Sequence, residues 1–559
     1  MFKNSRLFSG LAWSLFYLLV FVLLLQHSFS YLDPDFGWHL RMGQDVALTG
    51  KVASLNYSNY TLLGERWVDH EWLSNLTIYY IYTDFGYITL NIIFGLLPIL
   101  TLIIVNYLLR KVYKVDTRKR LWSLMLFEIL AIVAVTPHLG VRIQEITLLF
   151  LAILLLLIYK YNRRPNYLVL SVLPPLVYLW SNLHGGFLLG LAIMFMFPVV
   201  KMAELILSRF WPWKYISFKQ TLKTRQIFLF FLAAGASFLL TLLTPYRLEL
   251  YSFLFGYSNT FYLDHIVEWL PQWSFPYQYW QFTYISVLAL ALGFYLRDVF
   301  VKRTKQIRLW EIGLCLVFLL MAIKSRRHFP LLFVASFPWL FWYLSDFLSF
   351  VPKDKPVKKE AKNSLLNYGL RLFIVLVFLV VSFDLFLAIR FTSKPFTAFC
   401  EDKYVASRHQ TLYPCRAVDY LKANKSLANE RLFNHFGWGG YLIWGYPSAQ
   451  LFIDGRMPQA AYKGRTILEE YFDFLRDGKA AAKLKEYDIS LVLLENKKGP
   501  VKLSWWEKKI FLINEEEINR PSSYLEDYLS SSTDWQLLYH DSISSIYRRN
   551  SADRLAGTD

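Results

Sequence analysis

The stretch from Tyr31 to Arg41 carries two carboxylates, an imidazole and a guanidinium, directly after an apolar run that can cross a bilayer. Ionised side chains beside hydrocarbon are costly unless they are paired, metal-bound or hydrated, so in membrane proteins they mark ion or substrate sites. Pro34 favours an extended Asp33 at the entry to a helix that continues through Trp38 and Arg41. The pattern alone gives equal weight to a site built on the two aspartates and to a solvated loop with a helix N-cap.

Binding of a divalent cation is one function that this stretch could have. On the expected helix Asp35 and His39 are four residues apart and share a face, which suits a metal ion or a carboxylate–imidazole pair. Two neighbouring carboxylates would repel an anionic lipid phosphate unless Mg²⁺ or Mn²⁺, or nearby Arg or Lys, offset their charge. Asp33, Asp35 and His39 are therefore candidate metal ligands, and the metal requirement stays open.

A second titratable run, Asp69-His70-Glu71, lies between Trp67 and Trp72, whose side chains suit a membrane interface. Two interpretations are open. Either Asp69 caps the next helix, or His70 and Glu71 complete the pocket that the two earlier aspartates begin.

Cations also lie in linkers where the positive-inside rule does not require them. A guanidinium can hold two phosphate oxygens at once. The candidate phosphate ligands are Arg142, Lys324, Arg326 and Arg327. The alternative is that these side chains extend to lipid headgroups.

Two further residues are candidates for the wall of a pocket. His184 lies in a tight turn before Gly185 and Gly186, where the glycines are expected to be steric and the histidine to line a pocket at most. Glu268 lies in a long outer linker beside Trp269, and a general acid–base or acceptor-binding role is open to it.

The composition indicates a membrane protein. Of the 559 residues, 55% are hydrophobic and only 18% are charged. The net charge of +18 could suggest nucleic acid, but the Lys and Arg residues lie in short blocks between apolar runs. Because the positive-inside rule explains such blocks, we expect no nucleic-acid partner.

Apolar runs predict about eleven membrane crossings. They cover residues 11–29, 86–109, 122–139, 144–159, 166–181, 185–206, 227–244, 280–296, 309–323, 329–350 and 367–390. The first run follows Lys3 and Arg6 and is interpreted as an uncleaved anchor with its N-terminus in the cytoplasm. Basic blocks in alternate linkers fix the orientation of the rest.

This topology places the candidate site residues in one compartment. The loop 30–75, the turn 184–186, the stretch 246–279, the cluster 324–328 and everything after residue 391 fall outside the cytoplasm. A transporter is expected to place polar groups at mid-membrane and to open to both sides. Polar groups concentrated at one interface suit an enzyme that acts on a lipid-borne substrate.

The chain divides into a membrane domain, 1–392, with its first outer loop at 30–75, and a soluble extracytoplasmic α/β domain, 393–559. Cys400 and Cys415 are spaced so that they could form a disulfide in an oxidising compartment, and whether they do is left open. In the soluble domain, glycine-rich turns surround Trp438, Tyr441, Asp454 and Arg456. A fold-making role for these turns is the favoured interpretation.

Taken together, these motifs resemble the GT-C superfamily of integral membrane glycosyltransferases, and in particular a bacterial branch of it. The resemblance rests on Asp33-Pro34-Asp35, Trp38-His39, Gly43, the run 67–73, Arg142-Ile143-Gln144, the run 182–186, the run 438–441 and the run 452–456. It implies a multi-helix membrane fold of about eleven spans with a C-terminal extracytoplasmic α/β domain. It also implies transfer of a sugar from a polyprenyl-phosphate or polyprenyl-pyrophosphate donor through carboxylates of the first outer loop.

Three motifs resemble those of the oligosaccharyltransferase catalytic subunit. Asp33-Pro34 is similar to its Asp-Pro, the run 265–268 to its glutamate motif, and the run 438–441 to its acceptor-binding motif. Gly439 and Gly440 occupy the region of the acidic residue in the last of these, which argues against protein N-glycosylation.

The resemblance implies roles for individual residues. Asp33 and Asp35 are the catalytic candidates, and an inverting displacement of lipid phosphate is expected. The supporting pocket is His39, Asp69, His70, Glu71, His184 and Glu268, and the acceptor side is Trp438, Tyr441, Asp454 and Arg456. The expected partners are a polyprenyl-linked sugar donor, membrane lipids and a lipid, glycan or protein acceptor, in a bacterial cytoplasmic membrane. A lipid-linked polysaccharide polymerase or ligase, and a non-enzymatic membrane assembly or transport protein, are the alternatives.

Overall fold

The computed structural model describes residues 2–210, 222–256, 260–302, 305–345, 383, 386, 399–400, 412–476, 478–496, 502–509, 513–518 and 524–550. The chain forms two compact units. A helical unit comprises Met1–Tyr31, His70–Leu254 and Leu263–Ser393, and a sheet-containing unit comprises Leu32–Asp69, Phe255–Tyr262 and Lys394–Asp559.

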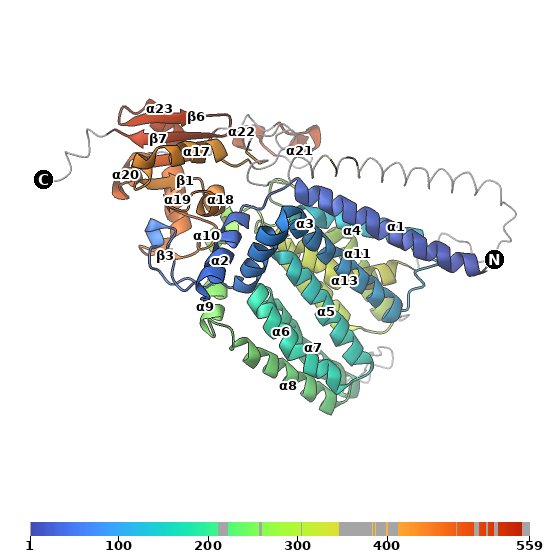
Figure 1. Ribbon diagram of the computed structural model, residues 1–559. Coiled ribbons are helices and arrows are strands. Elements are labelled where there is room, and N and C mark those ends of the chain that lie inside the picture. The colour runs from blue at the N-terminus through green and yellow to red at the C-terminus, as the bar shows by residue number, and fades with distance from the viewer. Residues whose placement is uncertain are drawn as a thin grey trace. The chain divides into compact units, whose positions relative to one another are not determined.

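The helical unit is built from long apolar helices. In the described residues they are α1 (Phe2–Phe29), α3 (Trp72–Lys111), α4 (Leu121–Val135), α5 (Gln144–Arg163), α6 (Tyr167–Leu183), α7 (Phe187–Phe210), α8 (Thr224–Thr241), α11 (Tyr279–Phe300), α12 (Leu309–Lys324) and α13 (Phe329–Leu344). Short helices α9 (Glu249–Gly256) and α10 (Thr260–His265) precede α11. Long helices such as α5, α6 and α7 lie alongside one another (Figure 1).

Seven of the described helices are long and apolar enough to cross a membrane. The helices α6, α12 and α13 are shorter, at 17, 16 and 16 residues. Ten of the expected crossings therefore coincide with helices, and the eleventh, 367–390, lies outside the described residues apart from two positions. The expected class, a multi-pass helical membrane protein with a C-terminal sheet-containing region, is confirmed.

The helix of the second predicted crossing begins earlier than the sequence predicts. We expected a crossing from residue 86, but α3 starts at Trp72 and contains a kink at Gly86, where φ is +83°. A left-handed conformation of this kind favours glycine, which explains why two helical segments join at this residue. The early start places His70 and Glu71 directly at the beginning of a helix.

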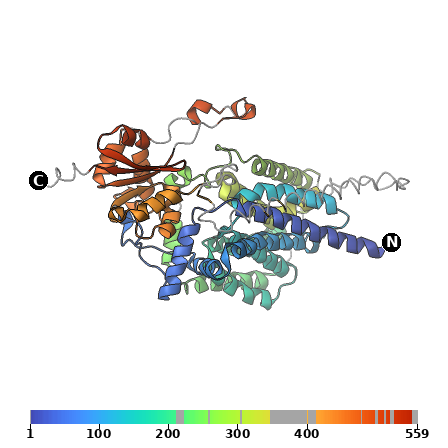
Figure 2. The ribbon, with the colours of Figure 1, turned by 45° about the horizontal axis from the view of Figure 1, so that its top comes forward.

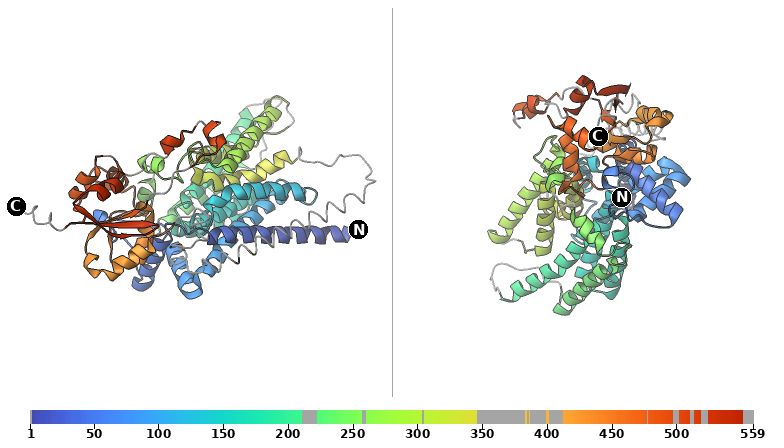
Figure 3. Two further views of the ribbon diagram at one scale, coloured as in Figure 1. Left: turned by 90° about the horizontal axis from the view of Figure 1, so that it is seen from above. Right: turned by 90° about the vertical axis from the view of Figure 1, so that its left-hand side faces the viewer.

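Close packing in the helical unit depends on small residues at crossing points. A Cβ added to Gly190 of α7 would lie 2.5 Å from the ring of Trp180, which is fully buried on α6. On α3, a Cβ at Gly95 would lie 3.0 Å from the Leu25 side chain of α1. Small residues of this kind let helix backbones approach closely in membranes. Figure 3 shows α1 and its neighbouring helices along their length.

The sheet-containing unit has five strands in the order β2-β1-β5-β7-β6. They are β1 (Arg431–Asn434), β2 (Gln450–Leu451), β5 (Leu491–Glu495), β6 (Trp535–His540) and β7 (Ser544–Arg549). Strand β1 pairs in parallel with β2 and β5, and β7 pairs antiparallel with β5 and β6. Figure 2 shows the C-terminal strands in red beside the helices of this unit.

Short helices and one hairpin complete this unit. They are α17 (Cys415–Ala423), α18 (Gly439–Gly445), β3 (Ala461–Tyr462), β4 (Arg465–Thr466), α19 (Ile467–Leu475), α20 (Ala480–Glu486), α21 (Trp505–Lys509), α22 (Glu515–Ile518) and α23 (Leu525–Ser531). The rings of Phe433, Phe452 and Phe474 meet in the core, with centroids 4.5 to 5.2 Å apart. Burial of such aromatic surface is a main source of stability in a small domain.

The first outer loop belongs to the sheet-containing unit by its contacts, although the sequence grouped it with the membrane domain. It contains α2 (Phe36–Thr49) and η1 (Tyr60–Leu62). Asn59 forms a parallel bridge with Leu451 of β2, and the Thr61 hydroxyl donates a hydrogen bond of 2.6 Å to the Phe452 carbonyl. The loop that carries the two aspartates is therefore held by residues about 390 positions further along the chain.

Two glycines allow α2 to pack directly on α18. A Cβ at Gly37 would lie 2.3 Å from the Gly440 carbonyl oxygen, and a Cβ at Gly440 would lie 2.3 Å from the Pro34 carbonyl oxygen. Both obstacles are backbone atoms, which cannot move aside as a side chain can. Glycine is therefore the residue that this contact requires.

Gly37→Ala or Gly440→Ala is expected to lower the free energy of unfolding of this unit by about 1–3 kcal/mol, the usual cost of excess volume in a packed interface. Thermal unfolding of the full chain, followed by limited proteolysis, measures the loss. Gly437→Ala is the matched control, because its added Cβ would lie 3.3 Å from the flexible His435 ring. Equal melting of Gly440→Ala and Gly437→Ala would contradict the close backbone approach.

Candidate functional site

The residues singled out in the sequence fall into both units. The sheet-containing unit holds Asp33, Asp35, His39, Asp69, Trp438, Tyr441, Asp454 and Arg456, and the helical unit holds His70, Glu71, Arg142, His184, Glu268, Lys324, Arg326 and Arg327.

Asp33 and Asp35 form the turn that opens α2. The Asp33 carboxylate accepts the Asp35 backbone N–H at 2.8 Å, and its carbonyl accepts the Phe36 N–H at 3.1 Å. The Asp35 carboxylate accepts the indole N–H of Trp38 at 2.9 Å. Asp35, not Asp33, is the N-cap of the helix, and Asp33 is the more buried of the two. Hydrogen bonds within this turn therefore orient both carboxylates.

His39 lies on α2, four residues after Asp35. Its buried imidazole packs on the Trp38 ring with centroids 3.8 Å apart. Across the described residues, no three His, Cys, Asp or Glu side chains converge as metal ligands. A requirement for Mg²⁺ or Mn²⁺ stays a prediction.

Asp454 and Arg456 form a buried clamp on the first outer loop. The guanidinium binds both Asp454 carboxylate oxygens, at 3.0 and 2.8 Å. It also donates to the side-chain oxygens of Asn56 and Asn59, at 3.0 and 3.2 Å, and lies over the ring of Trp67. Burial alone would lower the pKa of Arg456, but the Asp454 carboxylate raises it. This geometry favours a fold-making role for the pair, the interpretation that the sequence already preferred.

Arg456→Met is expected to destabilise the sheet-containing unit by about 3–5 kcal/mol, because it leaves the Asp454 carboxylate buried without its partner. Thermal unfolding of the full chain measures the change. Arg476→Met is the control: its side chain is half exposed and pairs with Asp473 at 3.0 Å, so its loss should cost about 1 kcal/mol or less. Equal effects of the two substitutions would show that the clamp contributes little.

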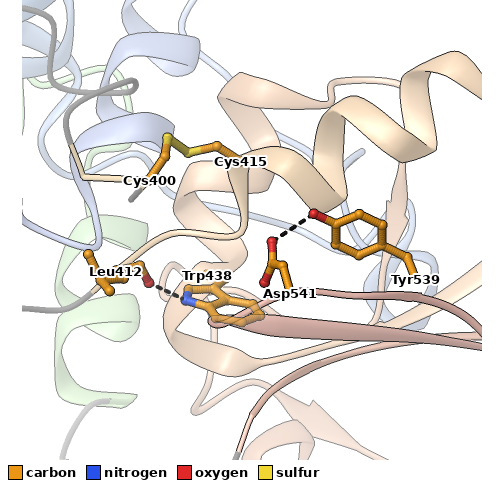
Figure 4. The surroundings of a disulfide bond; sticks show 6 residues. All are labelled: Cys400, Leu412, Cys415, Trp438, Tyr539 and Asp541. Atoms are coloured by element: carbon orange, nitrogen blue, oxygen red, sulfur yellow. Dashed lines mark hydrogen bonds between the residues drawn. A yellow bond between two sulfur atoms is a disulfide. The ribbon is translucent and has the colours of Figure 1, made fainter. Parts of the chain in front are cut away.

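Trp438 and Tyr441 are core residues of this unit. The Trp438 indole is fully buried and donates to the Leu412 carbonyl at 3.0 Å (Figure 4). The Tyr441 ring packs on Tyr413 with centroids 5.2 Å apart, and burial raises the pKa of its hydroxyl. Both side chains are used for packing in this structure, and their role on the acceptor side stays a prediction.

The two cysteines that the sequence left open form a disulfide. Cys400 and Cys415 are joined with their Cα atoms 5.4 Å apart, at the first residue of α17 (Figure 4). A structural disulfide is typical of an oxidising compartment.

In the helical unit, Glu268 bridges two arginines from different linkers. Arg142 binds one of its carboxylate oxygens at 2.7 Å, and Arg327 binds the other at 3.2 Å. Arg142 also donates to the Tyr31 hydroxyl at 3.0 Å and lies over that ring, while Arg327 lies over the ring of Trp269. Linkers that are far apart in the sequence therefore meet at one end of the bundle.

The electrostatics of this cluster keep Glu268 ionised. Burial would raise the pKa of its carboxyl, but Arg142 and Arg327 together lower it to about 2. The His138 ring interacts electrostatically with four charged groups: Arg142, Glu268, Arg326 and Arg327. Arg326 therefore belongs to the same cluster.

Arg326 is the most buried cation of the cluster. Its side chain is 2% exposed, and one terminal nitrogen donates to the Ser274 carbonyl. Its Nε and Nη1 are buried and have no hydrogen-bond partner among the described residues. Burial lowers the pKa of this guanidinium. A buried guanidinium in this state is costly unless a further acceptor binds it. Lys324, by contrast, is exposed.

A second cluster surrounds Glu71 at the start of α3. One of its carboxylate oxygens lies 3.4 Å from Nε2 of His70 and 3.4 Å from Nε2 of His184. His184 Nδ1 accepts the Gly186 N–H at 3.0 Å and lies 2.6 Å from the Thr147 hydroxyl. Because Nδ1 accepts a backbone N–H, the proton of neutral His184 is on Nε2 and faces Glu71.

The glycines of the His184 turn are steric, as the sequence indicated. A Cβ at Gly186 would lie 2.3 Å from the Thr147 hydroxyl oxygen, and a Cβ at Gly185 would lie 3.2 Å from the His70 ring. The sequence treated His184 as a pocket wall, whereas the structure connects it to Glu71 and Thr147. The sequence analysis did not single out Thr147, because one polar residue in an apolar helix forms no recognisable pattern.

Comparisons with known proteins give remote structural likenesses and no sequence match. No family model and no curated protein sequence matches the chain. Among solved structures, the chain is similar to ArnT from Cupriavidus metallidurans bound to undecaprenyl phosphate, with a TM-score of 0.43, 10% identity and coverage of 98% of each chain. A likeness this distant carries no functional conclusion by itself.

Proposed function

We propose that this chain is a membrane glycosyltransferase that moves a sugar from a polyprenyl-phosphate or polyprenyl-pyrophosphate donor to a lipid, glycan or protein acceptor at the extracytoplasmic face. The observation that supports it most is the cluster of Arg142, Arg326 and Arg327, in which the first two side chains are buried and N–H groups of Arg326 lack a partner among the described residues. Guanidinium groups suit phosphate because they offer two parallel donors.

The positions of the arginines along the chain suit a lipid-borne donor. Arg142 precedes α5, Glu268 precedes α11, and Arg327 lies between α12 and α13. The distribution of Lys and Arg in the sequence assigns all three linkers to the extracytoplasmic side. A donor whose tail is in the membrane presents its phosphate at the membrane interface, where linkers between spans lie.

The proposed reaction is an in-line displacement at the anomeric carbon. Asp33 or Asp35 accepts the proton of the acceptor hydroxyl, whose oxygen forms the new bond to the sugar. The bond between the sugar and the phosphate oxygen breaks, and both of its electrons leave with the lipid phosphate. The arginines stabilise the negative charge that develops there, which is worth most in a site of low dielectric. A single displacement inverts the anomeric configuration.

Deletion of the gene is expected to make its host accumulate a polyprenyl-linked sugar, and the wild-type chain should clear it. Mass spectrometry of the lipid extract identifies the intermediate, and proteoliposomes loaded with that lipid then test transfer directly. The proposal fails if no lipid-linked sugar accumulates and the purified chain transfers none.

A lipid-linked polysaccharide polymerase or ligase is the second candidate. It is favoured by the arginine cluster, because guanidinium groups can bind and stabilise a leaving lipid phosphate directly. The two reactions differ in the donor, which carries a single sugar in one case and a glycan chain in the other. Transfer that persists in EDTA and requires an oligomeric donor would favour the second candidate.

A further inference from the structure

Glu268 occupies the position that an anion between two arginines would take. Its two carboxylate oxygens contact Arg142 and Arg327 separately, at 2.7 and 3.2 Å, as two oxygens of a bound phosphate would. Its side chain is 30% exposed, whereas that of Arg142 is 7% exposed. The Arg327 side chain is 28% exposed, so Glu268 and Arg327 are the partly exposed members of the cluster and Arg142 is the buried one.

The backbone of Glu268 is held while its side chain can turn. Its carbonyl accepts the Arg327 N–H at 2.9 Å and the Ser325 hydroxyl at 3.4 Å. The residue lies in a turn between α10 and α11, outside any helix. A change of side-chain rotamer would withdraw the carboxylate from both arginines and leave the backbone contacts in place.

We infer that Glu268 is a stand-in for the donor phosphate: it binds Arg142 and Arg327 in the empty enzyme and is displaced when a polyprenyl phosphate head group binds. This inference rests on the proposed function and adds to it which group occupies the phosphate site before the donor binds. The low pKa of Glu268 agrees with it, because a carboxylate that stays ionised competes with phosphate at every working pH.

The exchange has a physical consequence for affinity. Each phosphate that binds must first break the ion pairs of Glu268, so the observed affinity is lower than the arginines alone would give. A head group that carries more than one negative charge replaces a single carboxylate most effectively. The lipid phosphate that leaves in the reaction carries about two charges at neutral pH, more than the single charge of a donor phosphodiester. Displacement of Glu268 therefore favours binding of the leaving lipid phosphate over binding of the donor phosphodiester.

The test measures binding of undecaprenyl phosphate to the full chain in nanodiscs. Glu268→Gln removes the competing charge and keeps the shape, so it should lower the Kd by about tenfold, the scale of one close charge interaction. Asp264→Asn is the matched control: Asp264 is an exposed acid four residues away, and its loss should change the Kd less than twofold, as expected for a screened surface charge. Uncharged undecaprenol should bind every variant equally, and inorganic phosphate should compete better in Glu268→Gln.

Two outcomes would overturn the inference in distinguishable ways. If Glu268→Gln leaves the Kd unchanged or raises it while Arg327→Ala weakens binding, the arginines bind phosphate and Glu268 is not its stand-in. If neither substitution changes the Kd, the phosphate site of the proposed function fails as well. Glu268→Asp keeps the charge and should retain the wild-type Kd more closely than Glu268→Gln, which separates charge from altered packing.

Discussion

Asp33→Asn or Asp35→Asn is expected to reduce sugar transfer at least about a hundredfold, the usual contribution of a positioned proton acceptor. An asparagine has nearly the same shape and keeps an oxygen that can accept a hydrogen bond, so the Asp35 N–H and the Trp38 indole retain their acceptors. What the substitution removes is the negative charge and the basicity. Initial rates in proteoliposomes with the identified lipid-linked sugar measure the loss.

The control for this experiment lies on the same helix. Asp45 pairs with Arg41 at 3.2 Å on a partly exposed face of α2, and Asp45→Asn should leave the transfer rate within about twofold, as expected for an exposed ion pair. Membrane insertion and melting temperature should match the wild type in all variants. A double variant of Asp33 and Asp35 that still transfers sugar would reject the assignment of the base, whatever the arginines do.

The helices of the membrane unit could be predicted because their signal is local. A run such as 144–159 is apolar over a full bilayer thickness, and α5 covers it from Gln144 to Arg163. The start of α3 at Trp72 was missed because the polar and aromatic residues before Gly86 do not form an apolar run, although they are helical. Hydropathy predicts the part of a helix that lies in lipid. It does not predict the part of the helix that extends beyond the membrane.

The candidate site was predicted as a set of motifs, and the contacts among them were not. The sequence named Arg142, Glu268 and Arg327, but only the folded chain pairs the carboxylate with both guanidinium groups. The bridge between Asn59 and Leu451 is likewise a contact between distant segments that neither segment indicates alone. Local patterns identify residues that are costly to bury, and the fold decides which partners offset that cost.

Arg142→Ala is expected to lower kcat/KM about a hundredfold to a thousandfold, comparable with the loss of a donor that stabilises developing negative charge. The side chain is buried, bonds Glu268 at 2.7 Å and is oriented by the Tyr31 hydroxyl at 3.0 Å. If it acts on the leaving phosphate, kcat should fall by more than the Kd for the donor rises, because the charge is largest in the transition state. Arg142→Lys should recover only part of the rate, since an ammonium cannot hold two oxygens in a planar fork.

Tyr31→Phe separates the arginine's charge from its orientation. It removes one hydrogen bond from Arg142 and keeps the ring over which the guanidinium lies, so the rate should fall about tenfold to a hundredfold, in line with one hydrogen bond from a charged donor. Combining Arg142→Ala with Glu268→Gln should restore donor binding in part, because it removes the competing carboxylate along with one of its partners. If the double variant instead binds donor as poorly as Arg142→Ala alone, Glu268 does not compete with the phosphate, and Arg142 would act on the reaction through some other group.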